Sequence, residues 1–90
     1  MKAIKQAVAG SLESSDAMVT IAPSEDAKVE YSIESIVIKQ FGKRIRAVTE
    51  EVVAASGLEG VKVRVQDRGA LECTLRARLE TAIARAADRA

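Results

Sequence analysis

Residues 28–34, KVEYSIE, alternate between polar and apolar side chains, and the alternation stops at Ser35. A period of two places Val29, Tyr31 and Ile33 on one face, which is the pattern of a half-buried strand. Beyond Ser35 the apolar residues recur every three or four positions: Ile38, Phe41, Ile45, Val48, Val52 and Ala55. That spacing predicts an amphipathic helix with one stripe facing the core. The stretch therefore predicts a strand followed directly by a helix.

The ends of this helix also have signals in the sequence. Ser35 stands where a side-chain oxygen could cap the first turn, so we expect it to be the N-cap. Gly57 stands where a glycine in the left-handed conformation commonly ends a helix.

Upstream of this stretch the sequence predicts two more strands. Residues 5–12 form a weak strand softened by Gly10, and residues 17–22 form a second strand that Pro23 closes. Small and polar residues at 13–16 and 23–26 predict turns between the strands. Three strands joined by short turns favour an antiparallel meander.

Downstream, residues 61–66 alternate valine with polar residues, which predicts a fourth strand. Residues 67–69 predict a turn, and the apolar stripe of a second helix follows it: Leu71, Leu75, Leu79, Ile83 and Ala86. The expected order is β-β-β-α-β-α. We therefore predict an α+β fold in which a mainly antiparallel four-stranded sheet carries two helices on one face, with residues 1–90 as a single domain.

The composition narrows the chemistry that the chain can perform. Its 90 residues are 48% hydrophobic and 30% charged, with one Cys and no His. Without His there is no imidazole base or histidine metal site, and one Cys forms no intrachain disulfide. No apolar run is long enough to span a membrane, and the first residues lack a signal-peptide pattern, so we expect a cytoplasmic location. Enzymatic activity of its own is therefore not expected.

A small nucleic-acid- or protein-binding module is an alternative, because basic side chains gather on both predicted helices. These are Lys39, Lys43, Arg44, Arg46, Arg76, Arg78, Arg85 and Arg89. The formal net charge is only +1, however, and a sheet that reads RNA usually needs exposed aromatic rings. Tyr31 and Phe41 are the only aromatic residues, and both lie on predicted core faces. We therefore expect no nucleic-acid partner.

The turn at residues 12–16, LESSD, holds two adjacent serines. Serines in turns usually bond nearby backbone groups, which is the simpler interpretation of Ser14 and Ser15. A hairpin turn is also a place where a hydroxyl stands clear of the protein and can be modified. A carrier of a covalently attached group would need no catalytic residues of its own, and the composition permits this.

Five segments together resemble a known family, and their order and spacing cover nearly the whole chain. They are residues 7–16, 21–23, 37–42, 67–73 and 75–80. In these segments the chain is similar to the gamma subunits of citrate lyase, the acyl carrier proteins of that enzyme. The four-helix acyl carriers of fatty acid synthesis are a poor match, because this chain begins with predicted strands.

The resemblance implies that Ser14 carries the prosthetic group, phosphoribosyl-dephospho-coenzyme A, through a phosphodiester. Ser15 is the fallback, at a position where relatives often have Gly. The arm ends in a thiol that holds an acetyl thioester. The alpha subunit would exchange acetyl for citryl, and the beta subunit would cleave the citryl thioester to oxaloacetate. The expected partners are these two subunits and a prosthetic-group transferase, and no membrane is expected.

Two related carriers stay open as alternatives, those of malonate decarboxylase and of citramalate lyase. For the turn itself, we hypothesise that Glu13 and Asp16 keep a phosphate-bearing arm from lying down on its own carrier. Cys73 is expected to be a small core residue of the second helix.

Overall fold

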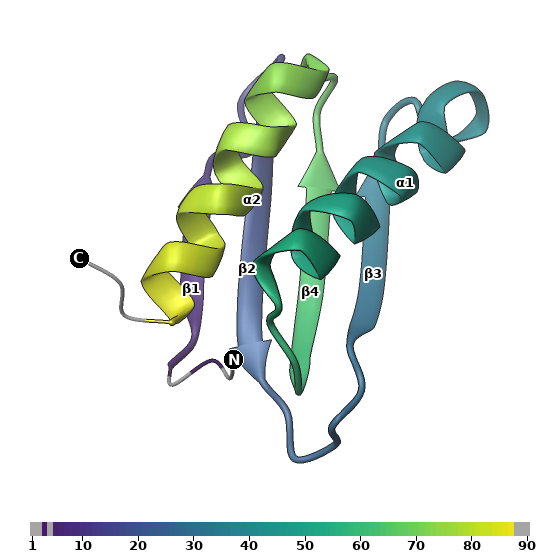
Figure 1. Cartoon of the computed structure of the whole chain (residues 1–90). Coiled ribbons are helices and arrows are strands. Elements are labelled where there is room, and N and C mark those ends of the chain that lie inside the picture. Colours follow the sequence, from purple (N-terminus) through teal and green to yellow (C-terminus); the bar gives the residue numbers. More distant parts are fainter. Residues whose placement is uncertain (1–2, 4, 88–90) are drawn as a thin grey trace.

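The computed structural model describes residue 3 and residues 5–87. It contains β1 (Ala7–Gly10), β2 (Ala17–Pro23), β3 (Glu30–Ser35), α1 (Ile38–Ser56), β4 (Val61–Asp67) and α2 (Glu72–Ala86). Figure 1 shows both helices packed side by side on one face of the sheet. The predicted α+β class and the predicted order of elements are confirmed. The strand at 28–34 begins two residues later than predicted, and the weak strand at 5–12 shortens to β1.

The strand order corrects the predicted meander, because β3 does not pair with β2. The order across the sheet is β1-β2-β4-β3, so β4 lies between β2 and β3. The β1–β2 and β2–β4 pairs are antiparallel, whereas β3 and β4 are parallel. The sheet of the described residues is therefore mixed, with antiparallel pairs in the majority.

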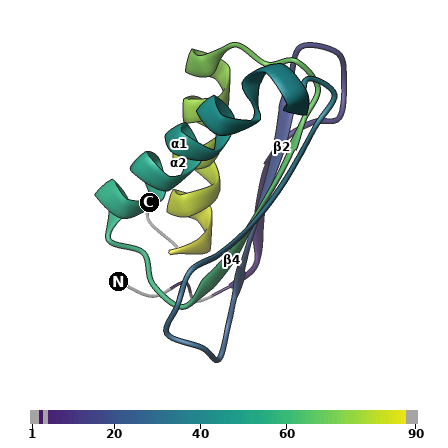
Figure 2. The same cartoon turned by 90° about the vertical axis from the view of Figure 1, so that its right-hand side faces the viewer.

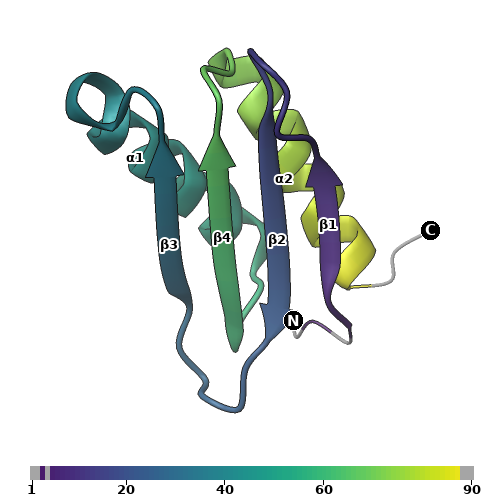
Figure 3. The same cartoon turned by 180° about the vertical axis from the view of Figure 1, so that it is seen from behind.

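Two physical features explain why β4 takes the central place. A helix between two strands returns the chain to the end where the first strand began, so β3-α1-β4 forms a parallel crossover. Val61, Val63 and Val65 of β4 are each at most 1% exposed, which suits the strand with a neighbour on both sides. No helix of the described residues lies on the other face of the sheet, as Figure 3 shows, and alternate residues of β4 point to that face.

The core lies between the covered face of the sheet and the two helices, and its buried side chains are aliphatic. Figure 2 shows this two-layer arrangement from the side. The largest buried apolar side chains of the strands and α2 include Val19, Ile21, Val63, Val65 and Leu79. Tyr31 is only partly buried and packs at the margin of the core, where the Arg46 guanidinium lies 5.5 Å from its ring centroid.

The predicted N-cap at Ser35 is wrong, and the predicted end at Gly57 is confirmed. Helix α1 is preceded by Val37, which makes no side-chain cap, and Gly57 has the left-handed φ of 72°. Ser35 instead ends β3, where its hydroxyl accepts a hydrogen bond from the Val37 N–H and donates one to Asp67 Oδ2 at 2.7 Å. The hydrogen bond to Asp67 of β4 therefore holds the Ser35 side chain at the end of the sheet.

Both predicted helix stripes extend further than the fold buries them. Ile38 and Phe41 at the start of α1 are 45% and 54% exposed, and Leu71 before α2 is 70% exposed. The reason is the length of the sheet: β3 and β4 end at Ser35 and Asp67, so the first turn of α1 and the segment before α2 lie past the surface that covers the rest of each stripe (Figure 1). Ala55, at the other end of α1, is also exposed.

The single thiol of the chain lies in the first turn of α2. Cys73 is exposed, contrary to the prediction, because it falls on the solvent side of the first turn of α2. Within residues 3 and 5–87, neither helix is long and apolar enough to cross a bilayer. Arg89, one of the basic residues of the second helix segment, lies outside the described residues.

Candidate functional site

The turn of residues 13–16, called the serine turn, lies between β1 and β2 at one end of the sheet. The N–H of Asp16 donates to the carbonyl oxygen of Glu13 at 3.1 Å, which closes a four-residue turn with Ser14 and Ser15 at its centre. Ser15 has a φ of 66°, and it is the only described residue other than glycine with a positive φ. A positive φ at the third position alone is the pattern of a type II turn, where Gly is favoured. Position 15 therefore has a backbone conformation that glycine adopts more readily than serine.

The Ser14 hydroxyl is exposed and has no hydrogen-bond partner among the residues that the structure describes. The interpretation of this serine as a turn-forming residue that bonds its own backbone is therefore not met at Ser14. Ser11 plays that part instead: its Oγ accepts the Glu13 N–H at 3.2 Å and donates to Asp16 Oδ2 at 2.6 Å. Ser14 is thus left at the tip of the turn with a free hydroxyl.

Asp16 anchors the turn to helix α2. Its Oδ1 accepts hydrogen bonds from the Ala17 N–H at 2.7 Å and from Arg78 Nε at 2.9 Å, and Arg78 Nη2 also donates to Oδ2. The hydrogen bonds from Arg78, then Ser11, then the Ala17 N–H hold the pKa of the Asp16 carboxyl well below its ordinary value. At neutral pH this carboxylate is therefore ionised and hydrogen-bonded within the turn, and its charge beside Ser14 is balanced by Arg78.

A second anchor joins the serine turn to the turn that follows β4. The Ser15 N–H donates to the carbonyl oxygen of Arg68 at 2.8 Å, and the Arg68 N–H donates to the carbonyl oxygen of Asp16 at 2.9 Å. The second turn is itself fixed by Asp67, which is 2% exposed and accepts hydrogen bonds from the N–H groups of Gly69 and Ala70. The base of Ser14 is thus tied to β4 as well as to α2.

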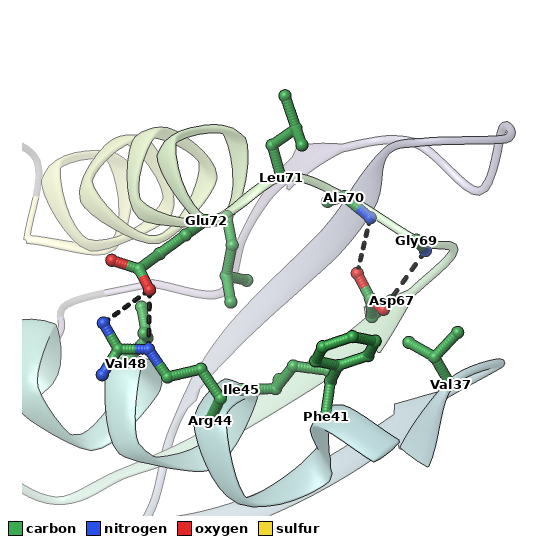
Figure 4. Close-up of a pocket in the computed structure, with 11 residues that line it drawn as sticks. Val37, Phe41, Arg44, Ile45, Val48, Asp67, Gly69, Ala70, Leu71 and Glu72 are labelled. Atoms are coloured by element: carbon green, nitrogen blue, oxygen red, sulfur yellow. Dashed lines mark hydrogen bonds and ion pairs between the residues drawn. The ribbon is translucent and has the colours of Figure 1, made fainter. Parts of the chain in front are cut away.

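An apolar pocket of about 370 Å³ opens at the same end of the molecule, between the starts of the two helices. Figure 4 shows the Phe41 ring and Val37 on the α1 side, the Asp67 carboxylate between Phe41 and the turn at Gly69 and Ala70, and Leu71 pointing away from Phe41. Its rim carries the ion pair between Arg44 and Glu72, whose closest atoms lie 2.6 Å apart. The Asp67 carboxylate accepts three hydrogen bonds, two from N–H groups of its own turn and one from the Ser35 hydroxyl. The pocket is therefore lined mainly by apolar side chains, and its one buried carboxylate already has hydrogen-bond partners within the protein.

Most of the arginines that suggested a nucleic-acid surface are engaged within the protein. Arg76 pairs with Glu51 and Glu72, and Arg78 pairs with Asp16. Arg85 donates to the carbonyl oxygen of Val8. Across the described chain there is no group of three side chains that could hold a metal ion. These arginines therefore connect α2 to α1, to the serine turn and to β1.

Sequence reasoning found the serine turn but missed what supports it. Ser11 and Arg78 had no sequence signal that linked them to Asp16, because Arg78 lies 62 positions away along the chain. The pairing of the serine turn with the turn at Arg68 was missed for the same reason. The clustering of apolar residues at this end did have a signal, since Phe41 and Leu71 were placed on helix stripes.

Comparisons with known proteins support one family. Residues 4–86 match the acyl carrier protein family described as malonate decarboxylase delta subunit (MdcD). The citrate lyase acyl carrier protein of Serratia proteamaculans is 53% identical over 88 residues, covering 98% of this chain and 86% of the relative. The citrate lyase acyl carrier protein of Edwardsiella ictaluri is 54% identical over 89 residues, covering 98% of this chain and 90% of the relative.

The fold is also found among solved structures. One chain of a Pseudomonas malonate decarboxylase hetero-tetramer in complex with malonate superposes with a TM-score of 0.79, covering 90% of this chain and 82% of that chain. The two sequences are 21% identical, so this likeness supports the fold. The sequence relatives confirm the resemblance and, with it, a carrier subunit that is not itself the catalyst. The chain belongs to the family of citrate lyase acyl carrier proteins.

Proposed function

We propose that this chain, as one domain of residues 1–90, is the acyl carrier subunit of a citrate lyase complex and that Ser14 is the attachment residue. Membership of an acyl carrier family implies a prosthetic group. The proposed group is phosphoribosyl-dephospho-coenzyme A, joined through a phosphodiester. The observation that carries the proposal is the exposed Ser14 hydroxyl, which has no partner among the described residues, on a turn that Asp16 and the Ser15 backbone tie to the rest of the fold.

The chain's own residues give the arm a defined base. Asp16 ties the turn to α2 and Ser15 ties it to the turn after β4, so Ser14 starts from a fixed place while nothing covers it. The arm, when bound, supplies a thiol that holds acetyl or citryl as a thioester. Covalent tethering raises the local concentration of such a group at a neighbouring active site to about the millimolar range. A fixed base with an open side is therefore what a carrier between the alpha and beta subunits requires.

The hypothesis that Glu13 and Asp16 both repel the arm needs correction at Asp16. Its carboxylate faces Ser11 and Arg78, and the paired guanidinium compensates its charge. Asp16 therefore supports the turn. Only Glu13 keeps an exposed carboxylate beside Ser14 without an ionic partner among the described residues. Any electrostatic effect on the arm would come from Glu13.

The proposal is tested by intact mass and peptide mapping of the chain co-produced with its modifying enzymes. We expect the added mass of phosphoribosyl-dephospho-coenzyme A in the wild type and in Ser15→Gly, and none in Ser14→Ala. The matched pair matters because either serine could carry the arm. Modification that survives in Ser14→Ala and disappears in Ser15→Gly would move the site. No added mass in the wild type, with the modifying enzymes active on a control carrier, would refute the carrier role.

The carrier of malonate decarboxylase is the second candidate, because the matching family and the superposed structure bear that name. The identities of 53% and 54% to citrate lyase carriers favour the lyase over the 21% identity to the decarboxylase chain. Reconstitution decides between them. The arm-loaded chain should restore citrate cleavage when added to lyase alpha and beta subunits, and it should not restore malonate decarboxylation to carrier-free decarboxylase subunits. The reverse result would assign the chain to the decarboxylase, and citramalate as the preferred substrate would assign it to that lyase.

A further inference from the structure

We propose that the apolar surface beside the serine turn is the docking surface for a catalytic subunit of the same complex. This surface, called the end patch, consists of Ile36, Ile38, Phe41 and Leu71. The proposal rests on the proposed function, since a carrier must bring its arm to an active site on another subunit. The occupant is a protein surface with an apolar side chain at its centre and carboxylates around it.

The end patch is strongly exposed because it lies beyond the ends of β3 and β4, where no element of this chain covers it among the described residues. Ile36 and Leu71 are 65% and 70% exposed, and Phe41 is 54% exposed. Scattered single apolar residues are normal on a protein surface, whereas a contiguous group marks an interaction site. Phe41 belongs to a helical stripe whose later members, such as Ile45, are buried. The stripe thus continues past the core of this chain, as it would if another protein covered it.

The end patch surrounds a hollow into which a side chain can enter. Phe41 and Leu71 line the pocket of about 370 Å³ (Figure 4). Ile36 adjoins it, because a Cβ placed on Gly69 of the pocket wall would lie 3.7 Å from Ile36 Cδ1. Binding energy at interfaces concentrates where an apolar or aromatic anchor fills such a pocket. The arrangement suits a protruding apolar side chain of the partner.

The end patch is continuous with the attachment turn. Its Leu71 follows the turn of residues 67–70, and that turn shares two backbone hydrogen bonds with the turn that bears Ser14. Figures 1 and 2 place the serine turn and the starts of both helices at one end of the molecule. A subunit docked on the end patch would therefore sit beside the origin of the arm.

The charges around the end patch indicate the chemistry of the partner. Lys39 and Lys43 alternate with the apolar residues of the first turns of α1, and both are exposed. Together with Arg68, they have no ionic partner among the residues that the structure describes. By contrast, Arg44 at the rim is neutralised by Glu72. Uncompensated cations at a rim favour a partner with carboxylates at matching positions.

The test measures binding of the arm-loaded chain to separately purified alpha and beta subunits of the lyase by calorimetry. Phe41→Ser should weaken binding to at least one subunit by about 10-fold or more, as loss of a central aromatic anchor does. Val8→Ser is the matched control, because Val8 is 41% exposed on the helix-free face of the sheet. It should leave binding within about 2-fold. Leu71→Ser provides a second variant if Phe41→Ser unfolds.

The charge of the rim is tested separately with Lys43→Glu. This variant should bind more weakly than the wild type, and the difference in affinity should grow as the salt concentration is lowered.

Unchanged binding of Phe41→Ser and Leu71→Ser to both subunits would overturn the proposal, as would an equal loss of binding in Val8→Ser. The arm itself could occupy the pocket. Amide chemical shifts that move at residues 37–45 when the free chain acquires its arm would show this and would also overturn the proposal. Intact mass reports loading at Ser14 independently, so failure of docking and failure of the carrier role are distinguishable.

Discussion

Replacing Ser15 by glycine should stabilise the chain, although the change removes a side chain. Ser15 has a φ of 66°, and its backbone N–H is held by the carbonyl oxygen of Arg68 at 2.8 Å. The left-handed conformation therefore cannot relax without breaking the link between the two turns. The Ser15 hydroxyl makes no hydrogen bond within the described residues, so its removal loses no interaction of the folded state.

The magnitude follows from two opposing terms. An L-residue in the left-handed region costs about 1–2 kcal/mol relative to its preferred conformation. Glycine avoids that cost but loses about 0.5–1 kcal/mol more backbone entropy on folding. The difference predicts a gain of about 0.5–1 kcal/mol in the free energy of unfolding. For a chain of this length, such a gain raises Tm by roughly 2–8 °C.

Urea unfolding followed by circular dichroism measures this gain, with Ser15→Ala as the matched control. Alanine lacks the hydroxyl but keeps the Cβ, so its stability should stay within about 0.5 kcal/mol of the wild type. The slope of the transition should be the same for all three proteins, since the buried surface does not change. A loss of stability in Ser15→Gly, or an equal gain in both variants, would refute the argument from the backbone conformation.

The other predictions concern the supports of the same turn and the exposed thiol. A Cβ on Gly10, whose φ is +91°, would lie 1.8 Å from the carbonyl oxygen of Ala17, so Gly10→Ala should lower the free energy of unfolding by at least about 2 kcal/mol in urea; an unchanged midpoint would contradict the close approach. Asp16→Asn removes a carboxylate whose folded pKa is held low, chiefly by Arg78. A depressed folded pKa stabilises the fold above the unfolded pKa of about 3.9, and this contribution is lost as the pH falls towards the folded value. The Tm of the wild type should therefore exceed that of Asp16→Asn at neutral pH, and the gap should narrow below about pH 4; a constant gap down to about pH 2 would disprove the linkage. Cys73 is exposed, so a thiol reagent should modify the native chain within a few-fold of the rate for the unfolded chain, whereas strong protection would show that the thiol is buried.

The local elements of this fold could be predicted because their signals are local. The alternation around Tyr31 and the three-four spacing after Ser35 each report one face of one element, and both elements formed, the strand within two residues of its predicted bounds. The pairing of strands could not be predicted in the same way. The short connection after Pro23 favours a hairpin, yet the Ser24 N–H donates to the carbonyl oxygen of Gly60 at 2.7 Å. The chain thus passes the start of β4 before it enters β3, and this contact between distant residues has no signature in either segment.

In the candidate site, too, local features could be predicted from the sequence, and contacts between distant residues could not. The turn that presents Ser14 was predicted from four consecutive residues, and its backbone is indeed a turn. The reason that Asp16 is present was misread, because its partner Arg78 comes from α2 and an isolated carboxylate beside a serine looks like a free charge. Likewise, Phe41 was assigned to the core because periodicity states which residues share a face, and says nothing of how far the sheet beneath that face extends.

The anchoring of the serine turn has a consequence for how the arm would be delivered. The hydrogen bonds of Ser15 to the Arg68 turn and of Asp16 to α2 join the attachment point to the turn and helix that form one side of the pocket. If the end patch docks as proposed, the origin of the arm is therefore set relative to the partner as soon as the two proteins meet. Only the arm itself then remains to be positioned, which lowers the entropy lost on reaching the active site. A turn that was free to move would add its own conformational entropy to that of the arm. The fixed base and the docking surface therefore both lower the entropy that is lost when the arm reaches the active site.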